Sequence, residues 1–114
     1  MLSSGDVVSL DPGVPVGRVA GFGHPAVVVT AQRILDGEPA VVHIVPLTST
    51  LRAFGSEVMI EADETNGLAV RSAAQCQHVR AVSTSRVGEV RGNVGPVVLG
   101  QLREALALIL DLCG

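Results

Sequence analysis

The chain has 114 residues, the length of one ordinary domain and too short for two, so we expect a single domain over residues 1–114. Its net charge of −3, from 8 basic and 11 acidic residues, argues against a large nucleic-acid-binding face, because such binding depends on many phosphate contacts. No apolar run approaches the roughly 20 residues that span a bilayer. We therefore expect no membrane segment and, because residues 1–10 reach a strand pattern without a leader, a cytoplasmic location.

Cysteine and histidine are too sparse and too widely spaced for a local metal motif. Cys76 and Cys113 lack CxxC spacing, which favours reduced thiols packed as small hydrophobes. His24, His43 and His78 form neither HxxxH nor HExxH. The sequence therefore predicts no metal ion and no other cofactor, and it predicts a structural role for His43, which lies in the middle of an apolar strand.

The first half of the chain reads as three strands, one long loop and a short helix. We expect strands at residues 5–11, 25–30 and 40–50, where apolar and β-branched residues dominate. Residues 12–23 are rich in glycine and proline without periodicity, which is typical of a loop. Residues 31–37 hold one or two helical turns stopped by glycine. The third strand ends in a cluster of hydroxyl side chains.

The second half adds four short strands and a final helix. The strands are expected at residues 56–62, 69–76, 78–83 and 87–92. From Pro96 onward, apolar residues recur at helical spacing, namely Val98, Leu102, Ala105, Leu106, Ile109 and Leu112. They nearly encircle the helix, more than one core-facing stripe needs, which indicates a second covering surface such as a homodimer partner. The elements together predict a mainly β fold, a strongly bent sheet or partly closed barrel capped by a helix.

The order of these pieces resembles the MazF/PemK family of toxin endoribonucleases over essentially the whole chain. The matching stretches are GDVVSLD, HPAVVVT, VVHIVPLTST, FGSEV and VRAVSTSRVGEV, followed by the final helix. The proline-led strand and V-P-L-T-S-T, in this order and at this distance, are the most specific. The resemblance implies an SH3-like barrel of the CcdB/PemK/MazF type, a homodimer, and metal-independent cleavage of single-stranded RNA. It also implies inhibition by a MazE-like antitoxin with an acidic, partly disordered tail.

The resemblance implies two catalytic positions, an arginine directly before the strand proline and a threonine after V-P-L. The threonine is present as Thr48, whereas His24 stands in place of the arginine. RNA cleavage through the 2′-OH needs a base, an acid, and donors that hold the charged phosphorane. A histidine with an unperturbed pKa near 6.5 suits proton transfer, although it lacks the bidentate, permanent grip of a guanidinium. We therefore expect His24 and Thr48 to be the catalytic pair.

Neighbouring hydroxyl groups and an arginine are expected to supply the missing grip on phosphate. The hydroxyl candidates are Ser49 and Thr50, which follow Thr48 directly. The arginine candidates are Arg52, four residues beyond Thr48, and Arg18 in the glycine-rich loop. Spacing alone does not choose between the two arginines, so both remain candidates for RNA binding.

Further RNA contacts are expected from the two aromatic residues and from the strand at residues 78–83. Phe22 is a candidate for stacking on a base, and Phe54 is expected to cover the barrel as a lid. The family's Asp-Gln pair corresponds here to Gln77 and His78, so His78 is either a second titrating group at the groove or a polar residue on an exposed strand face. Arg80 is a candidate for binding phosphate.

Three alternatives remain open. His24 could be a half-buried loop residue in a degenerate site, and Thr48 could end its strand with a hydroxyl that caps a turn. If the site is degenerate, the chain would act as an antitoxin-binding or RNA-binding module without cleavage. A CcdB-like topoisomerase inhibitor is the rival from another class, but that activity is associated with an aromatic C-terminal end, and this chain ends in LILDLCG and has no tryptophan.

Overall fold

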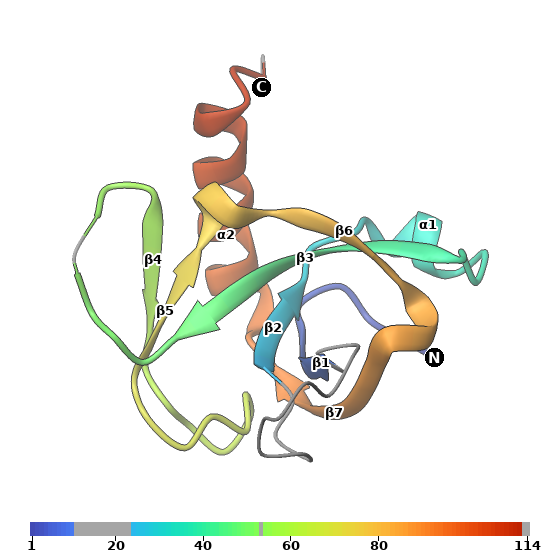
Figure 1. Cartoon of the computed structure of the whole chain (residues 1–114), viewed down its shortest axis with the longest axis horizontal. Coiled ribbons are helices and arrows are strands. Elements are labelled where there is room, and N and C mark those ends of the chain that lie inside the picture. The colour runs from blue at the N-terminus through green and yellow to red at the C-terminus, as the bar shows by residue number, and fades with distance from the viewer. Residues whose placement is uncertain (11–23, 53, 113–114) are drawn as a thin grey trace, which may run out of the picture.

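The computed structural model describes residues 1–10, 24–52 and 54–112 and places the strands and the final helix in the expected order (Figure 1). The elements of this part of the chain are β1 (Asp6–Leu10), β2 (His24–Val28), α1 (Gln32–Leu35), β3 (Val41–Thr48), β4 (Glu57–Ile60), β5 (Ser72–Gln75), η1 (Cys76–His78), β6 (Arg80–Ser83), η2 (Thr84–Arg86), β7 (Val87–Asn93) and α2 (Gly95–Ile109). None of the helices in these residues is long and apolar enough to cross a membrane.

All strand pairs are antiparallel, and the central strand is β3. The seven-stranded sheet runs in the order β4-β5-β3-β2-β1-β7, and β6 pairs with β3 off this path. The first half of β3 pairs with β6 and its last two residues pair with β5, so β3 joins two sets of strands. Figure 1 shows β4 and β5 at one end of the molecule and α1 at the other. The expected mainly β class with a C-terminal helix is confirmed, and in the described residues the strand path does not close on itself.

The central strands β1, β2 and β3 bury side chains on both faces, which explains why they read as continuous apolar runs. Side chains alternate between the two faces along a strand, so odd and even positions enter different cores. The odd positions form a cluster with the residues of β4, β5 and α2, namely Val7, Val27, Val45, Leu47, Ile60, Ala74, Cys76 and Leu102. The even positions form a second cluster with α1, namely Val8, Leu10, Ala26, Val28, Leu35, Val42 and Ile44.

The final helix covers the first of these cores with only part of its apolar surface. Leu102 is fully buried, and Val98, Ala105 and Leu106 pack against the cluster. Residues 108–112 are exposed, and Figure 1 shows the last turns of α2 projecting past the strands. The apolar excess expected from the sequence therefore lies on the surface of this chain.

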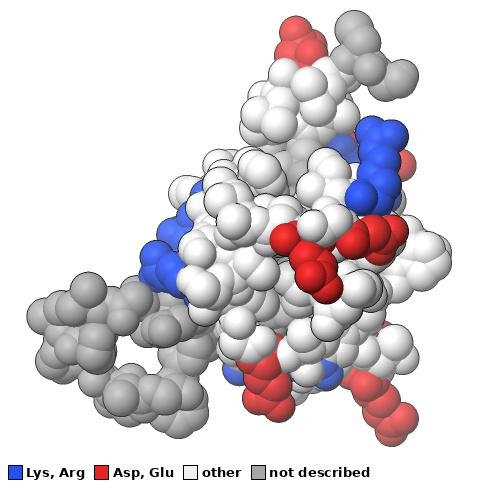
Figure 2. All heavy atoms as spheres, turned by 90° about the vertical axis from the view of Figure 1, so that its right-hand side faces the viewer, with Lys and Arg blue, Asp and Glu red and all other residues white. Residues whose placement is uncertain are grey.

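Charged side chains do not form one continuous basic surface on the face that carries α1 and the N-terminus. Figure 2 shows basic and acidic side chains scattered there, with uncharged surface between them. This distribution agrees with the expectation that the protein has no large nucleic-acid-binding face on this side.

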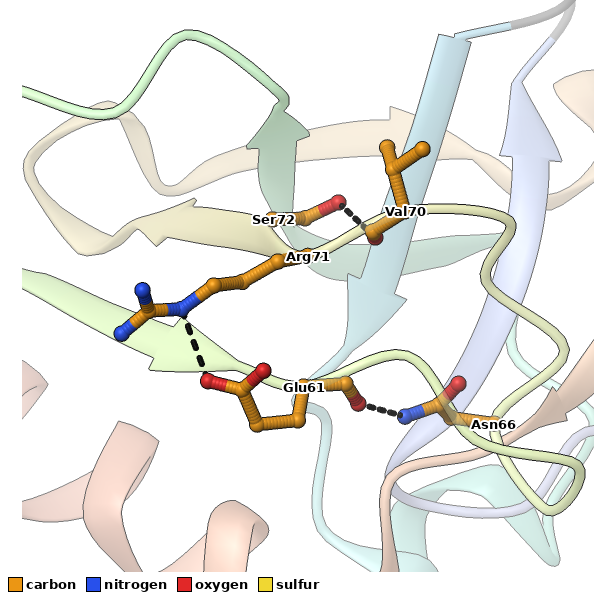
Figure 3. Close-up of polar contacts among 5 residues, drawn as sticks. All are labelled: Glu61, Asn66, Val70, Arg71 and Ser72. Atoms are coloured by element: carbon orange, nitrogen blue, oxygen red, sulfur yellow. Dashed lines mark hydrogen bonds and ion pairs between the residues drawn. The ribbon is translucent and has the colours of Figure 1, made fainter.

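The segment between β4 and β5 is folded around one buried amide. Asn66 Oδ1 accepts hydrogen bonds from the backbone N–H of Asp63 and Leu68, at 3.1 and 2.9 Å, and Asn66 Nδ2 donates to the carbonyl of Glu61 at 2.8 Å (Figure 3). The backbone of this segment also touches β7, since Asn93 N donates to Thr65 O at 2.9 Å. The segment is thus attached to a strand that follows it by more than twenty residues.

Glycine makes this close approach of two backbones possible. Gly67 has a φ of +70°, and a Cβ there would lie 2.4 Å from the carbonyl oxygen of Arg91. A Cβ at Gly92 would lie 2.3 Å from Thr65 O. Neither backbone can retreat without breaking the hydrogen bonds of the segment or of the sheet, so both positions require glycine.

We expect Gly67→Ala to lower the free energy of unfolding by at least about 2 kcal/mol, because alanine is strained in the left-handed region and its Cβ would collide with backbone. Urea denaturation measures this change. Gly55→Ala is the matched control, since Gly55 has open space around its Cβ position, and its effect should stay within about 0.5 kcal/mol. Equal stability of the two variants would contradict the packing of this segment on β7.

Candidate functional site

The pairing of β2 with β3 leaves His24 and Thr48 at the same end of the two strands. The paired residues are Ala26 with Pro46, Val27 with Val45, and Val28 with Ile44. His24 lies two residues before Ala26 and Thr48 two residues after Pro46, so His24 begins β2 where Thr48 ends β3. His24 also pairs with Leu10 of β1, and Thr48 pairs with Ala73 of β5. The two residues thus meet at the rim of the sheet, where the buried part of each strand stops.

A hollow of about 440 Å³ lies on one side of this rim. It is lined by Leu10, His24, Pro46, Leu47, Thr48, Gln75, His78 and Arg80. Four of the expected site residues therefore come together here, from three strands and from η1. Two imidazoles, one hydroxyl and one guanidinium border the same space, a combination suited to binding a phosphate and moving protons around it.

A second hollow of about 330 Å³ lies beside the first. Its lining residues are His24, Pro25, Leu47, Thr48, Ser49, Leu68, Ala69, Val70, Ser72 and Arg91. His24, Leu47 and Thr48 line both hollows, so they form a ridge between them. We call these two spaces the first and the second hollow. An extended chain that crossed the ridge would pass directly over His24 and Thr48.

Thr48 accepts a hydrogen bond through its hydroxyl oxygen and keeps its hydroxyl proton available. The backbone N–H of Thr50 donates to Thr48 Oγ1 at 3.1 Å, which is the turn-capping bond considered from the sequence. A threonine hydroxyl that accepts in this way still has one O–H to donate. Capping the turn and donating to a phosphate oxygen are therefore compatible, and the cap orients the hydroxyl.

His78 reaches the first hollow because η1 is held on two sides. The side-chain amide of Gln77 accepts from Ser56 Oγ at 3.0 Å and donates to Glu57 Oε2 at 3.1 Å. Cys76 is buried in the core beneath. The anchoring residues lie about twenty positions apart in the sequence, so spacing could not predict their contact. Glu57 does lie within the SEV stretch on which the resemblance rests.

Known proteins share both the sequence pattern and this arrangement of strands. A sequence model of the PemK-like, MazF-like toxin of type II toxin–antitoxin systems matches residues 3–110. The chain belongs to this family. It is 35% identical over 120 residues to endoribonuclease MazF9 of Mycobacterium tuberculosis (strain ATCC 25618 / H37Rv), with 98% of each chain covered. The family recognised from the sequence is thus confirmed.

Solved structures of MazF proteins share the fold. The Mycobacterium tuberculosis toxin MazF-mt6 superposes with a TM-score of 0.76 at 20% identity, covering 96% of this chain and 99% of that one. A MazE-MazF structure from Deinococcus radiodurans gives a TM-score of 0.79 at 23% identity, covering 98% of this chain and 97% of that one. At this level of identity the likeness concerns the fold alone.

Of the other residues expected at the MazF-like site, Ser49 lines the second hollow, and the rest lie elsewhere or outside the described residues. The guanidinium carbon of Arg52 lies 5.5 Å from the centroid of the Phe54 ring, and neither residue lines a hollow. Thr50 is exposed and lines neither hollow. Arg18 and Phe22 fall in residues 11–23, outside the described part of the chain. Arg91, which lines the second hollow, was not expected from the sequence.

The described cysteine and the other polar groups near the site fit no alternative chemistry. Burial raises the pKa of the Cys76 thiol to about 11, and the charge of Glu57 acts in the same direction, so the thiol stays protonated at neutral pH. Cys76 is therefore packed as expected and does not serve as a nucleophile. Within residues 1–10, 24–52 and 54–112, no three His, Cys, Asp or Glu side chains gather to hold a metal ion.

Proposed function

We propose that this chain, a MazF-like toxin of a type II toxin–antitoxin system, is an endoribonuclease that cleaves single-stranded RNA across the ridge of His24 and Thr48. The observation that carries the proposal is that His24 and Thr48, at the same end of β2 and β3, line both hollows. Family membership and the 35% identity to a named endoribonuclease, over 98% of both chains, support the activity. Incubating the purified protein with mixed-sequence RNA, with and without EDTA, tests it, and we expect cleavage that resists the chelator.

The proposed reaction is an attack of the ribose 2′-oxygen on the neighbouring phosphorus. A base removes the 2′-OH proton, the new bond joins the 2′-oxygen to phosphorus, and the bond from phosphorus to the 5′-oxygen breaks. An acid gives its proton to that leaving oxygen. The products are a 2′,3′-cyclic phosphate and a free 5′-hydroxyl, and no metal ion or cofactor enters the balance.

The side chains of the first hollow suit these roles. His24 and His78 line the same hollow, so two imidazoles are available to take one proton and give another. The Thr48 hydroxyl is in place to donate to a phosphate oxygen while the backbone N–H of Thr50 fixes its orientation. Arg80 adds a permanent positive charge for phosphate on the same wall.

The proposed partners are single-stranded RNA, a cognate MazE-like antitoxin and a second copy of this chain. Solved relatives include a MazE-MazF structure from Deinococcus radiodurans and a mycobacterial endoribonuclease in complex with its cognate antitoxin. An acidic antitoxin segment would place carboxylates where RNA places phosphates, and so exclude RNA from the hollows by charge as well as by volume. We propose that the protein acts in the cytoplasm, where its RNA substrate is found.

A second candidate function is binding without cleavage, and one specific observation favours it. The residue before the strand proline is His24, so the family's guanidinium is absent from this position. A chain that had lost catalysis would still keep the hollows and their basic residues. The variants of His24 described below separate the two functions.

Replacing Thr48 by alanine should lower the cleavage rate by about 100-fold to 1000-fold, because a donor to the developing phosphorane charge is lost. The fold should persist, since the hydroxyl makes only one hydrogen bond, which contributes about 1 kcal/mol. Single-turnover cleavage and circular dichroism measure the two effects. Thr65→Ala is the control, because Thr65 is exposed and lines neither hollow. Cleavage by Thr48→Ala at the wild-type rate would remove Thr48 from the site.

The cleavage rate should change with pH near neutrality, because His24 transfers a proton in the proposed reaction. His24→Ala should lose that dependence together with about 100-fold to 10,000-fold of the rate. His24→Arg should keep activity with a flatter profile, since a guanidinium does not titrate there. The pH–rate profiles of the wild type and of the variants His24→Ala, His24→Arg, His78→Gln and His43→Gln are compared.

His43 is the matched control in that experiment, because its side chain is exposed on β3 and lines neither hollow. If only His78→Gln removed the pH dependence, proton transfer would belong to His78. A wild type inert on every RNA, together with an active His24→Arg variant, would identify a degenerate site and favour the binding function.

The protein should form a homodimer through the exposed apolar surface of α2. Val97 and Leu108 are 75% and 85% exposed, and Leu110 and Leu112 are also exposed. Light scattering at micromolar concentration should give twice 11.7 kDa. Leu108→Asp should weaken the dimer, whereas Ile34→Asp on α1, at a side chain that is also exposed, should not. A wild-type mass of one chain would contradict this prediction.

A further inference from the structure

Arg91 is the charged residue that the second hollow adds to the site. It lies on β7, its side chain is exposed, and its Nε donates to Ser9 Oγ on β1 at 2.8 Å. Ser9 pairs with Pro25, the residue after His24. The guanidinium of Arg91 therefore extends across β1 toward the strand that carries His24, and it does so from the side opposite to Arg80.

Among the described residues, no carboxylate forms an ion pair with Arg91. Its hydrogen-bond partner, Ser9, is neutral, and the lining residues of the second hollow include no aspartate or glutamate. Arg71 differs, because its Nε lies 2.7 Å from Glu61 Oε2 (Figure 3). With Nε bound to Ser9, the outer edge of the Arg91 guanidinium still presents donors to an anion.

The wall that faces the ridge is apolar and fixed in place. Leu68, Ala69 and Val70 form it, and Val70 is 54% exposed. Figure 3 shows Val70 on the turn that leads into β5, where the hydroxyl of Ser72 donates to the Val70 carbonyl at 3.0 Å. Upstream, the backbone of Gly67 touches the backbone of Arg91 itself. The backbone that leads to the apolar wall and the backbone of Arg91 are therefore in direct contact.

We propose that the second hollow binds the nucleotide next to the scissile phosphate, with Arg91 holding the phosphate of that nucleotide and Leu68 and Val70 contacting its base. This inference rests on the proposed function. A phosphate is the anion that fits, because every nucleotide of an RNA strand that crosses the ridge carries one and because phosphate accepts the paired donors of a guanidinium. Apolar side chains contact any base face, so the wall supplies affinity for a base without demanding one sequence.

The decisive experiment neutralises one RNA phosphate at a time. The RNA is a short oligonucleotide that the wild-type protein cuts, selected from a mixed-sequence pool, and methylphosphonate replaces each non-scissile phosphate in turn. Affinity and kcat/KM are measured for the wild type and for Arg91→Gln, Arg91→Lys and Arg103→Gln. Arg103 is the matched control, since it also donates to a serine hydroxyl, that of Ser4 at 2.9 Å, but lies on α2 and lines neither hollow.

Arg91→Gln should weaken RNA binding by about 10-fold to 100-fold, with most of the loss in KM, because a charge-assisted contact to phosphate is removed. One methylphosphonate next to the cleavage point should weaken wild-type binding and leave Arg91→Gln unaffected, while the other positions affect both proteins alike. The slope of log affinity against log salt should fall by about 0.7 for the lost phosphate. Arg91→Lys should lie between, and Arg103→Gln should match the wild type.

Three results would overturn the inference. Arg91→Gln could bind and cut like the wild type, or it could lose affinity while keeping the wild-type response to every methylphosphonate, which would indicate a structural role. It could also lose binding to the antitoxin alone. If the wild type binds RNA but does not cut it, the proposed catalysis fails, and the affinity scan with a 12-residue oligouridine still decides the role of Arg91.

Discussion

The pairing of β2 with β3 is the constraint on which the site depends. Because both faces of these strands are buried, a slip of one residue would move the odd side chains into the core built for the even ones. The register is therefore fixed by two cores at once. His24 and Thr48 stand at the ends of the same pair of strands, so the packing that stabilises the fold also determines which two polar side chains meet at the rim.

The other functional side chains reach this rim from outside β2 and β3. Their elements are β6, which pairs with β3, β7, which pairs with β1, and η1, which lies between β5 and β6. η1 brings His78, β6 brings Arg80, and β7 brings Arg91. Each is held by its own local contacts, as Gln77 holds η1 and Ser9 holds Arg91. The position of the ridge therefore follows from the packing of the core. The basic residues on either side of it, Arg80 and Arg91, come from separate segments of the chain.

Much of the fold could be predicted from the sequence, because apolar runs, turn residues and helical spacing are local signals. The neighbourhood of His24 and Thr48 was implied by the family resemblance, and the strand register now explains it. Arg91 could not be predicted, because β1 and β7 pair through two register shifts, near Val7 and Val8 and between Val8 and Leu10. Such bulges change the face on which a residue lies, so neither spacing nor alternation indicates where Arg91 points. Arg52 was one of two arginine candidates for the phosphate, between which spacing did not choose, and its guanidinium lies over Phe54.

In the segment between β4 and β5, the path of the backbone does not depend on the side chains that face the second hollow. Its path is set by the Asn66 amide and by glycine backbones that touch β7, and none of these contacts involves the side chains of Leu68, Ala69 or Val70. Leu68 packs against the core, whereas Ala69 and Val70 are exposed, so the latter two positions beside the ridge can be exchanged without refolding the chain. A lineage of such proteins could acquire new preferences for the bound polymer by replacing these side chains, while the strands and the reacting groups stay where they are.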